Sequence, residues 1–324
     1  MNSPGIKAYI AGHTGMVGSA IRRRLERGGY EIASPAVRID LRDQLAVFNY
    51  LKSVKPDWVF MAAAKVGGIW ANTTYPADFI YDNLVIQTNV MHASYLAGVK
   101  KLMFLGSSCI YPRLAEQPIK EEYLLSGYLE PTNKPYAVAK IAGIVMAQAY
   151  NTQYGTNFLS VMPTNLYGPN DNYDPKNSHV IPGLIRKFHE AKVRGDDEVE
   201  VWGTGTPLRE FLHVDDLADA CVFLMERYDS GEIVNIGSGA EVSIRELAVM
   251  VGEVVGFRGR IRFNPDYPDG TPRKLLDISR LQSLGWRPTI GLREGLVSAY
   301  AWFVEHVAGS AGNEALGQRR RVTA

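Results

Sequence analysis

A tyrosine and a lysine four residues apart carry the clearest chemical signal in this sequence. Tyr136 and Lys140 stand in the segment PYAVAK, downstream of a strand-like run that ends in GSSC at 106–109. On a helix, positions i and i+4 share one face, so the phenol and the ammonium would point into the same space. A nearby ammonium favours the ionised phenol and lowers its pKa from about 10. The pair therefore predicts a proton donor to a carbonyl that works near neutral pH.

Three glycines near the N-terminus predict a dinucleotide-binding loop. Gly12, Gly15 and Gly18 follow a strand-like run at 7–11 and open a helix at 18–27. Such glycines allow a tight turn and a close approach of the backbone to a pyrophosphate, and the helix N-terminus supplies N–H groups and a positive dipole. Together with Tyr136 and Lys140, the loop predicts hydride transfer at a carbonyl, with a nicotinamide as the hydride source.

Other residues of the first half are placed to meet a dinucleotide. Asp40-Leu41 ends a short predicted strand and is positioned for the adenine, and the small residues Ala62, Ala63 and Ala64 would let the dinucleotide lie flat. An acid at the end of the second strand would indicate NAD, and an arginine NADP. Neither is present, because the turn reads SPAVR at 34–38, and Arg38 is the only nearby cation.

Two residues after the strand-like run at 101–106 add to the chemistry. If the strand continues past Gly106, Ser107 and Cys109 project to the same side. Ser107 can then donate a hydrogen bond to a substrate carbonyl beside Tyr136. Cys109 is open to two interpretations: a small buried thiol, or an acid/base group whose pKa is tuned by cationic neighbours.

Composition limits the classes of function. The chain has 324 residues, is 46% hydrophobic and carries a formal net charge of +1, so no whole-protein field favours nucleic acid or an anionic membrane. Its two cysteines cannot build a disulfide framework and have no metal-ligand spacing. Met1 is followed almost at once by a strand, and no apolar run approaches a membrane span. We expect a cytoplasmic protein without a metal.

Strand and helix signals alternate along the first half of the chain. Strand-like runs at 7–11, 30–33, 37–40, 58–64, 101–106 and 158–162 are interleaved with helical runs at 18–27, 43–52, 83–97 and 136–150. This rhythm predicts an α/β fold: a Rossmann-type doubly wound parallel sheet with a smaller, discontinuous α/β substrate domain.

The rhythm breaks after residue 166. A helix at 179–191, a strand, turn and strand at 199–202, 203–206 and 209–213, a helix at 215–225 and a capping box from Ser243 to Glu246 are expected. We expect residues 1–166, with about 211–237 returning, to form the dinucleotide-binding domain. Residues of about 167–210 and 238–308 would form the substrate domain, and 309–324 a disordered tail.

The chain also resembles a known family. Its glycine pattern, Asp40-Leu41, Ser107 and the Tyr136–Lys140 spacing are similar to those of the extended short-chain dehydrogenase/reductases that act on nucleotide sugars. Longer stretches resemble the GDP-sugar epimerase-reductases of that family: AAAKVGGI from Ala62, NTTYPADFI from Asn72, LGSSCIYP from Leu105, EPTN from Glu130, PYAVAKIAG from Pro135, VMPTNLYGP from Val161, NSHVIP from Asn177, REFLHVDD from Arg209 and DGTPRK from Asp269. The resemblance runs from about residue 8 to about residue 305.

The resemblance implies conversion of GDP-4-keto-6-deoxy-D-mannose to GDP-L-fucose by epimerisation at C3 and C5 and then NADPH-dependent reduction at C4. By this resemblance, Tyr136 is the proton donor of the reduction, Lys140 orients it and holds the nicotinamide ribose, and Ser107 polarises the carbonyl. Cys109 would be the base at C3 and C5, and His179 the acid on the other face. A helix-start histidine that bonds backbone is the alternative for His179. One ketone serves both epimerisations, because it acidifies the hydrogens on both adjacent carbons.

The resemblance also implies contacts with the cofactor, the substrate and a second subunit. Cofactor contacts are expected from Gly12, His13, Thr14, Gly15, Met16, Val17, Gly18, Arg38, Asp40, Leu41, Ala62, Ala63, Ala64, Leu105, Gly106, Ser107, Ser108, Tyr136, Lys140, Pro163, Thr164, Asn165, Leu166 and His179. Substrate contacts are expected from Ser107, Ser108, Cys109, Asn165, Lys187, Trp202, Arg209 and Asp269, with Lys187 and Arg209 on the diphosphate and Trp202 on guanine. The helices at 83–97 and 136–150 resemble a pair that forms a four-helix homodimer interface.

Two departures from the family bear on the cofactor. Thr14 stands where the family loop often has arginine, and the stretch 34–36 replaces arginines that often follow the second strand. We therefore predict use of NADP(H), with weaker discrimination against NAD(H) than a two-arginine site would give.

Three alternatives stay open on the sequence. The first is a nucleotide-sugar 4-epimerase that keeps NAD bound, which would need only the tyrosine and the lysine. The second is a related GDP-sugar epimerase-reductase, such as a GDP-L-colitose synthase. The third is a non-catalytic, dinucleotide-sensing binding protein, although such proteins can lose the tyrosine or the lysine and this chain has both.

Overall fold

A six-stranded parallel sheet forms the centre of the structure, a computed structural model that describes residues 5–33, 35, 38–175, 177–267 and 269–309. Its strands, in spatial order, are β2 (Glu31–Ala33), β1 (Lys7–Ala11), β3 (Trp58–Met61), β4 (Lys101–Leu105), β5 (Phe158–Pro163) and β9 (Val234–Ile236). Every neighbouring pair is parallel. All residues of β3, β4 and β5 are buried, as expected for strands covered on both faces.

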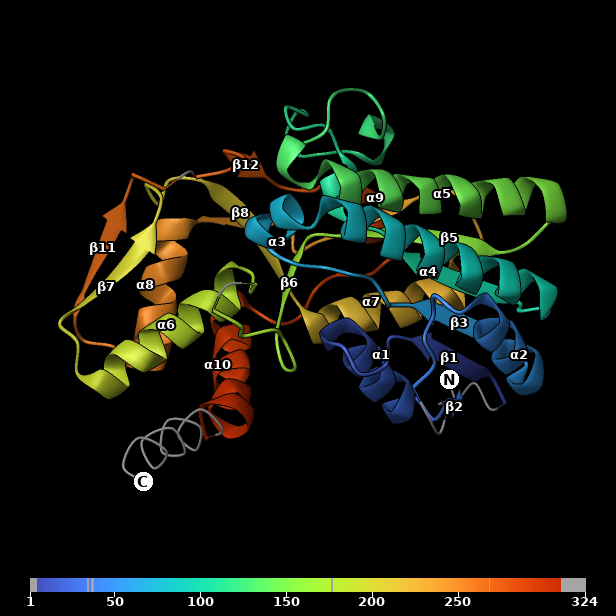
Figure 1. Ribbon diagram of the computed structural model, residues 1–324, viewed down its shortest axis with the longest axis horizontal. Coiled ribbons are helices and arrows are strands. Elements are labelled where there is room, and N and C mark those ends of the chain that lie inside the picture. The colour runs from blue at the N-terminus through green and yellow to red at the C-terminus, as the bar shows by residue number, and fades with distance from the viewer. Residues whose placement is uncertain (1–4, 34, 36–37, 176, 268, 310–324) are drawn as a thin grey trace.

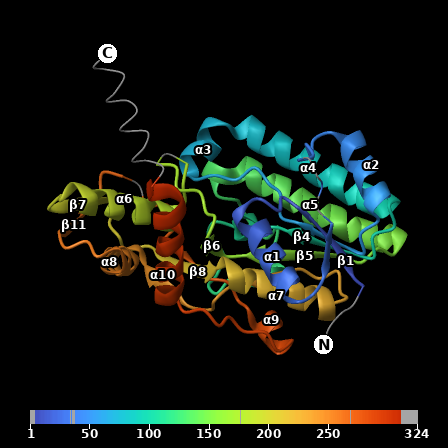
Figure 2. The same cartoon turned by 90° about the horizontal axis from the view of Figure 1, so that it is seen from below.

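Helices cover both faces of this sheet, so the predicted doubly wound α/β fold is confirmed (Figures 1 and 2). Along β1, Ala8 and Ile10 pack in the core with α1 (Met16–Arg27) and α7 (Val214–Arg227). Tyr9 and Ala11 point the other way, because successive side chains of a strand alternate between its faces. The core on that side includes residues of α2 (Gln44–Val54), α4 (Pro76–Leu96) and α5 (Lys134–Tyr154).

The elements after residue 164 include two smaller sheets. Strands β6 (Asn165–Tyr167), β10 (Glu241–Ser243) and β12 (Arg273–Lys274) all pair with β8 (Leu208–His213), and β7 (Glu198–Trp202) pairs with β11 (Arg260–Asn264). Helices α6 (Val180–Arg194), α8 (Ile244–Val255) and α10 (Leu292–Phe303) share a third core with these strands. The short helix α9 (Ser279–Ser283) lies against β9. The exact division into two domains stays a prediction.

Several elements differ from the sequence-based expectation. Strand β2 is present, but residues 38–40 form no strand, and residues 36 and 37 lie outside the described part of the chain. Helix α4 begins at Pro76, seven residues earlier than predicted, with Pro at its start and Asp78 in its first turn, which are both favourable there. The preceding helix α3 (Ile69–Thr74) was not predicted. Of the predicted tail at 309–324, residues 310–324 lie outside the described part of the chain. Gly309 ends the last helical turn.

The two strands expected around the turn at 203–206 both form, but they do not pair with each other. β7 pairs with β11 and β8 with β6, β10 and β12, so the two strands belong to different sheets. The Asp269 carboxylate accepts hydrogen bonds from the backbone N–H and the hydroxyl of Thr204, both at 2.7 Å. The capping box at the start of α8 is confirmed, with Ser243 and Glu246 bonded to each other's backbone N–H.

Candidate active site

Helix α5 carries Tyr136 and Lys140 on one face, one turn apart. Pro135 stands in its first turn, where a missing N–H costs nothing. Lys140 is 3% exposed, and its Nζ donates a hydrogen bond of 2.7 Å to the Leu105 carbonyl at the end of β4. The same Nζ lies 5.9 Å from the centre of the Tyr136 ring. The helix thus brings the phenol and the amine together beside the carboxyl end of the sheet.

The electrostatics of this pair differ from the expectation. Burial lowers the pKa of Lys140 to about 7. Burial also raises the pKa of Tyr136, and charge on Cys109 raises it further, while a hydrogen bond with the Ser107 hydroxyl lowers it. The predicted lowering of the pKa of Tyr136 by Lys140 is therefore wrong. An enclosed lysine loses much of its own charge, so it no longer stabilises a neighbouring phenolate as an exposed ammonium would.

The sequence allows a strand that continues past Gly106, but Ser107 and Cys109 do not lie on one. β4 ends at Leu105, and a 3₁₀ helix, η1 (Ser108–Ile110), follows. The Ser107 hydroxyl begins this helix by accepting a hydrogen bond of 3.2 Å from the Cys109 N–H. The turn still leaves Ser107 in contact with Tyr136, and Cys109 half-buried beside them.

Lys274 is a neighbour of Cys109 that sequence reasoning did not single out. Its Nζ lies 3.6 Å from the Cys109 sulfur, although the two residues are 165 positions apart in the chain. Lys274 ends β12, which pairs with β8 so that Lys274 stands beside Arg209. The only signal in the sequence was the stretch DGTPRK, which ends in this lysine and was quoted for its family resemblance alone.

His179 stands immediately before α6 and comes close to the same lysine. Its side chain makes no capping hydrogen bond with the helix, so the alternative of a backbone-bonded histidine finds no support at that position. Loss of surrounding water lowers the pKa of His179, and the positive charge of Lys274 lowers it further, although the side chain keeps access to solvent. Cys109, Lys274 and His179, from three distant segments, therefore face one region next to Tyr136.

The Gly-rich loop has the shape that a dinucleotide requires. Gly12 has a φ of +89°, and a Cβ there would lie 2.8 Å from the backbone of Ala63; a Cβ on Gly18 would lie 2.1 Å from the Gly12 carbonyl oxygen. Helix α1 starts after Gly15 with no capping side chain and no acid in its first turn, which leaves its first N–H groups for an anion. The Thr14 carbonyl accepts a hydrogen bond of 2.7 Å from Asn170. Met16 and Val17 pack on the core beneath, and His13 is partly exposed.

The adenine side of the expected cofactor site holds a chain of ion pairs. Asp40 binds Arg42 at 2.8 Å, and hydrogen bonds from Arg42 lower the pKa of Asp40 to about 2. Arg42 reaches Asp82 at 3.5 Å, and Lys65 lies 3.0 Å from the same carboxylate. Arg38 is exposed. Asp40 is thus fixed by an arginine that sequence reasoning missed.

The remaining cofactor-side positions lie at the ends of the central strands. Leu41 offers its carbonyl to Asn89 at 3.0 Å, and Ala62, Ala63 and Ala64 follow β3 directly. Gly106 packs tightly on Met162, and Ser108 is buried. Pro163 ends β5, Thr164 donates its N–H to Ile236, and Leu166 lies in β6. Asn165 donates to the carbonyl of Glu210 at 2.7 Å, so its amide nitrogen already has a partner.

The four residues expected at the nucleotide end of the substrate lie close to one another. Trp202 is 59% exposed, stacks on Tyr267 at 4.5 Å, and has the Nζ of Lys187 5.1 Å from its ring. Burial lowers the pKa of Arg209, and Asp269 acts on it in the opposite sense. Asp269 itself braces Thr204, so the structure gives it a partner within the protein. An exposed tryptophan backed by a second ring offers a flat apolar surface.

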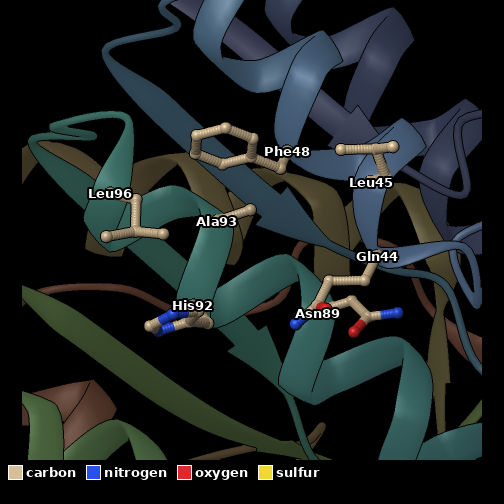
Figure 3. Close-up of a pocket in the computed structure, with 7 residues that line it drawn as sticks. All are labelled: Gln44, Leu45, Phe48, Asn89, His92, Ala93 and Leu96. Atoms are coloured by element: carbon tan, nitrogen blue, oxygen red, sulfur yellow. The ribbon is translucent and has the colours of Figure 1, made fainter.

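A groove lies between α2 and α4 (Figure 3). It is lined by Gln44, Leu45, Phe48, Asn89, His92, Ala93 and Leu96. Leu45 and Leu96 are more than half exposed. No expected site residue lines this groove. Among the described residues, no cluster of metal-binding side chains is present, and no helix could cross a membrane.

Comparison with known proteins agrees with this geometry. Residues 8–237 match the NAD dependent epimerase/dehydratase family, and the chain belongs to this family. Among its relatives, GDP-L-fucose synthase 1 of Arabidopsis thaliana is 60% identical over 95% of this chain and 96% of that protein. GDP-L-fucose synthase of Escherichia coli K12 is 54% identical over 93% of this chain and 97% of that protein. The structure of a GDP-L-fucose synthetase from Naegleria fowleri bound to NADP matches with a TM-score of 0.86 at 28% identity, over 93% and 94% of the two chains.

Proposed function

We propose that this protein converts GDP-4-keto-6-deoxy-D-mannose to GDP-L-fucose, by epimerisation at C3 and C5 followed by NADPH-dependent reduction at C4. The observation that carries the proposal is the convergence of two sets of groups on one region. Tyr136, Lys140 and Ser107 suit reduction of a carbonyl, while Cys109 and His179 suit proton exchange at the adjacent carbons. High identity to GDP-L-fucose synthases over nearly the whole chain supports the same substrate.

Epimerisation comes first in this mechanism. The ketone at C4 acidifies the hydrogens at C3 and C5, and the Cys109 thiolate removes each proton in turn. Ser107 and Tyr136 donate hydrogen bonds to the enolate oxygen. His179 returns a proton on the opposite face. The structure favours neutral imidazole in His179, so the negative charge of the enolate must offset the effect of Lys274 before His179 can act as an acid.

Reduction follows at the same carbonyl. The cofactor, when bound, supplies the hydride that reaches C4. Tyr136 then gives its phenolic proton to the C4 oxygen, and the raised pKa of Tyr136 keeps that proton in place until the alkoxide forms. Lys140 is fixed by Leu105 at the end of β4 and orients the phenol from one helical turn away.

NADP(H) fits the residues on the nucleotide side. The first N–H groups of α1 and the glycines at 12, 15 and 18 would hold the pyrophosphate, and the alanines after β3 leave room for the dinucleotide. Arg38 would meet the 2′-phosphate. Lys187 and Arg209 would meet the diphosphate of the GDP-sugar, and Trp202 its base.

The other enzymes considered are less well supported. A nucleotide-sugar 4-epimerase has no use for a cysteine, a lysine and a histidine grouped beside the tyrosine. A binding protein has no need of a proton donor and a buried lysine fixed at the end of β4.

Incubation with GDP-4-keto-6-deoxy-D-mannose and NADPH in deuterated water tests the proposal. We expect consumption of NADPH and a GDP-L-fucose product that carries deuterium at C3 and C5, detected by NMR. NADPH consumption without deuterium at either carbon would reveal a plain C4 reductase. No consumption of NADPH, with inversion at C4 alone, would reveal a 4-epimerase.

We also propose that the protein is a homodimer that pairs through α4 and α5. These helices lie side by side (Figures 1 and 2), and their sequences contain no Asp, Glu, Lys or Arg at 83–96 and 141–154. Val145 on α5 is 48% exposed, and the groove that includes Leu96 adjoins α4. Uncharged, partly apolar surface of this kind marks an interaction site.

Light scattering after size-exclusion chromatography tests the homodimer. We expect twice the chain mass of 35.9 kDa, and about one chain mass for Val145→Glu. Val193→Glu is a matched control, because Val193 is 72% exposed on α6, away from α4 and α5. A Val145→Glu protein that keeps the dimer mass would remove α5 from the interface.

A cytoplasmic location is part of the proposal as well. Both cysteines are free, and the proposed base must stay reduced, which suits a reducing compartment. Recovery of the protein with a secreted fraction would contradict this.

A further inference from the structure

Lys274 makes an unusual contact with the sulfur of Cys109. Its Nζ donates a weak hydrogen bond of 3.6 Å to that sulfur. Within the described part of the chain, no carboxylate lies within ion-pair distance of Lys274, whereas Lys65 has two and Lys101 has one. The ammonium of Lys274 therefore faces the thiol, and it is close enough to the imidazole of His179 for its charge to lower the pKa of that group.

The backbone around Lys274 is fixed from two directions. Glu210, which is 0% exposed, accepts a hydrogen bond of 3.1 Å from the Leu276 N–H through its carboxylate. Gln117 accepts a hydrogen bond of 2.8 Å from the Leu275 N–H, and the Leu275 carbonyl accepts one from Ile119. This anchoring gives Lys274 a defined position across from Cys109.

We propose that Lys274 is a positioning residue for the epimerisation, whose ammonium holds the Cys109 sulfur as the thiolate and directs it toward the substrate. Its place in the reaction rests on the proposed function, but the effect on the sulfur does not. An adjacent cation favours thiolate over thiol, and the thiolate is the form that can accept a proton from carbon.

The proton balance of the step follows from this assignment. The thiolate takes the proton from C3 or C5 and becomes the thiol, and the electron pair of the broken C–H bond moves into the enolate. Protonated His179 gives its proton to the same carbon from the other face and becomes neutral. Lys274 keeps its proton throughout. The thiol releases its proton to solvent and the imidazole takes one up before the next cycle.

Other titratable groups also face Cys109 and bear on any pH profile. Tyr136 of α5 interacts with it, and Lys140 stands one turn further along that helix. Ser107 lies on its own segment. Beyond Lys274, Arg209 is the paired residue on β8. A substitution at Lys274 removes the positive charge that contacts the sulfur and leaves these other groups unchanged.

The rate of alkylation by iodoacetamide measures the thiolate directly and needs no substrate. Cys221 is fully buried, so modification followed by intact mass reports on Cys109, with Cys109→Ser as the background. We expect Lys274→Met to react about tenfold more slowly at pH 7 and to approach the wild-type rate at high pH. Lys274→Arg should restore the rate to within about threefold, because it keeps the charge.

Two further measurements guard this result. Lys52→Met is the matched control, because it removes one lysine charge from the exposed surface of α2 and should leave alkylation unchanged. In Lys274→Met the pKa of His179, followed by NMR, should rise. If the methionine variant does not fold, Lys274→Gln gives the same comparison.

Alkylation of a folded Lys274→Met or Lys274→Gln protein at the wild-type rate at pH 7 would overturn the inference. Failure of the proposed function would look different. Cys109 would still react quickly in a Lys274-dependent way, but no deuterium would enter at C3 and C5. That result would keep the effect of Lys274 on the thiolate and remove only its role in epimerisation.

Discussion

The two halves of the chemistry are built in different ways. Tyr136 and Lys140 lie one turn apart on the inward-facing side of a single helix, and their relative position follows from helix geometry alone. Cys109, His179 and Lys274 come from a 3₁₀ turn, the start of a helix and the end of a short strand, and solvent reaches His179. The reducing pair is therefore local and enclosed, whereas the epimerising set exists only once distant segments have packed together.

This difference teaches how burial sets protonation in each half. Enclosure removes charge from Lys140 and retains the proton of Tyr136, which suits a donor that must wait for an alkoxide. In the other half, an ammonium stands against a sulfur without a competing carboxylate among the described residues. Burial thus disfavours the charged forms of Lys140 and Tyr136, whereas the ammonium of Lys274 stays charged beside the Cys109 sulfur.

The largest expected effect separates the two halves by substitution. Tyr136→Phe should slow C4 reduction by about 10²–10⁴-fold, the usual contribution of a general acid, yet leave measurable deuterium exchange at C3 and C5. Cys109→Ser should abolish exchange at both carbons. NMR of the sugar and NADPH absorbance measure the two activities. Normal exchange in Cys109→Ser would show that another group is the base.

The enclosed half predicts a pH dependence of stability. The pKa of Lys140 is about 7 in the folded chain and near 10.5 when unfolded, so between these values the unfolded chain binds the extra proton. The free energy of unfolding should then rise with pH across this window, by up to about 1.4 kcal/mol per pH unit. Lys140→Met lacks this term. Urea unfolding of both proteins at pH 7, 8 and 9 checks it, and parallel stability curves would contradict it.

The epimerising set of Cys109, His179 and Lys274 should be sensitive to a change at Glu210, which fixes the backbone next to Lys274. Glu210→Gln keeps the shape but replaces one carboxylate oxygen with an NH2 group that cannot accept a hydrogen bond, so the N–H of Gly239 or of Leu276 loses its acceptor. We expect a loss of about 1–3 kcal/mol in stability. Because Lys274 then moves, deuterium exchange at C3 and C5 should fall several-fold. Reduction of a simple keto-sugar by NADPH should fall less. Equal losses in both activities would mean that Glu210 supports the whole site rather than the epimerising half.

The smallest expected effect concerns the choice of cofactor. Arg38 is an exposed cation near Asp40 that, unlike Arg42, makes no ion pair with it, and Thr14 stands where the family loop often has arginine. Arg38→Ala should reduce the preference in kcat/KM for NADPH over NADH by about tenfold or less, since an exposed contact contributes little. Wild-type turnover with NADH that equals or exceeds that with NADPH would contradict the predicted preference.

Local patterns in the sequence predicted five of the six strands of the central sheet, the Gly-rich loop and the Tyr136–Lys140 pair, whereas β9 was not predicted. Lys274 could not be predicted in this way, since its contact with Cys109 spans 165 residues and depends on the pairing of β12 with β8. The pKa of Tyr136 was predicted with the wrong sign, because helical spacing does not report how deeply a helix is enclosed. Arg42 stands only two residues after Asp40 and was missed, and its link to Asp82 on α4 could not be read from the sequence.

The uncharged segments 83–96 of α4 and 141–154 of α5 have a consequence for how the protein behaves on dilution. Helix α5 carries Tyr136 and Lys140 on its inner side and Val145 on its outer side, so the same helix serves both the reaction and the proposed pairing of subunits. By mass action, subunits that dilution has separated would pair again, and regain the stability that pairing provides, only as their concentration rises. Specific activity should accordingly decline at nanomolar protein and recover on concentration.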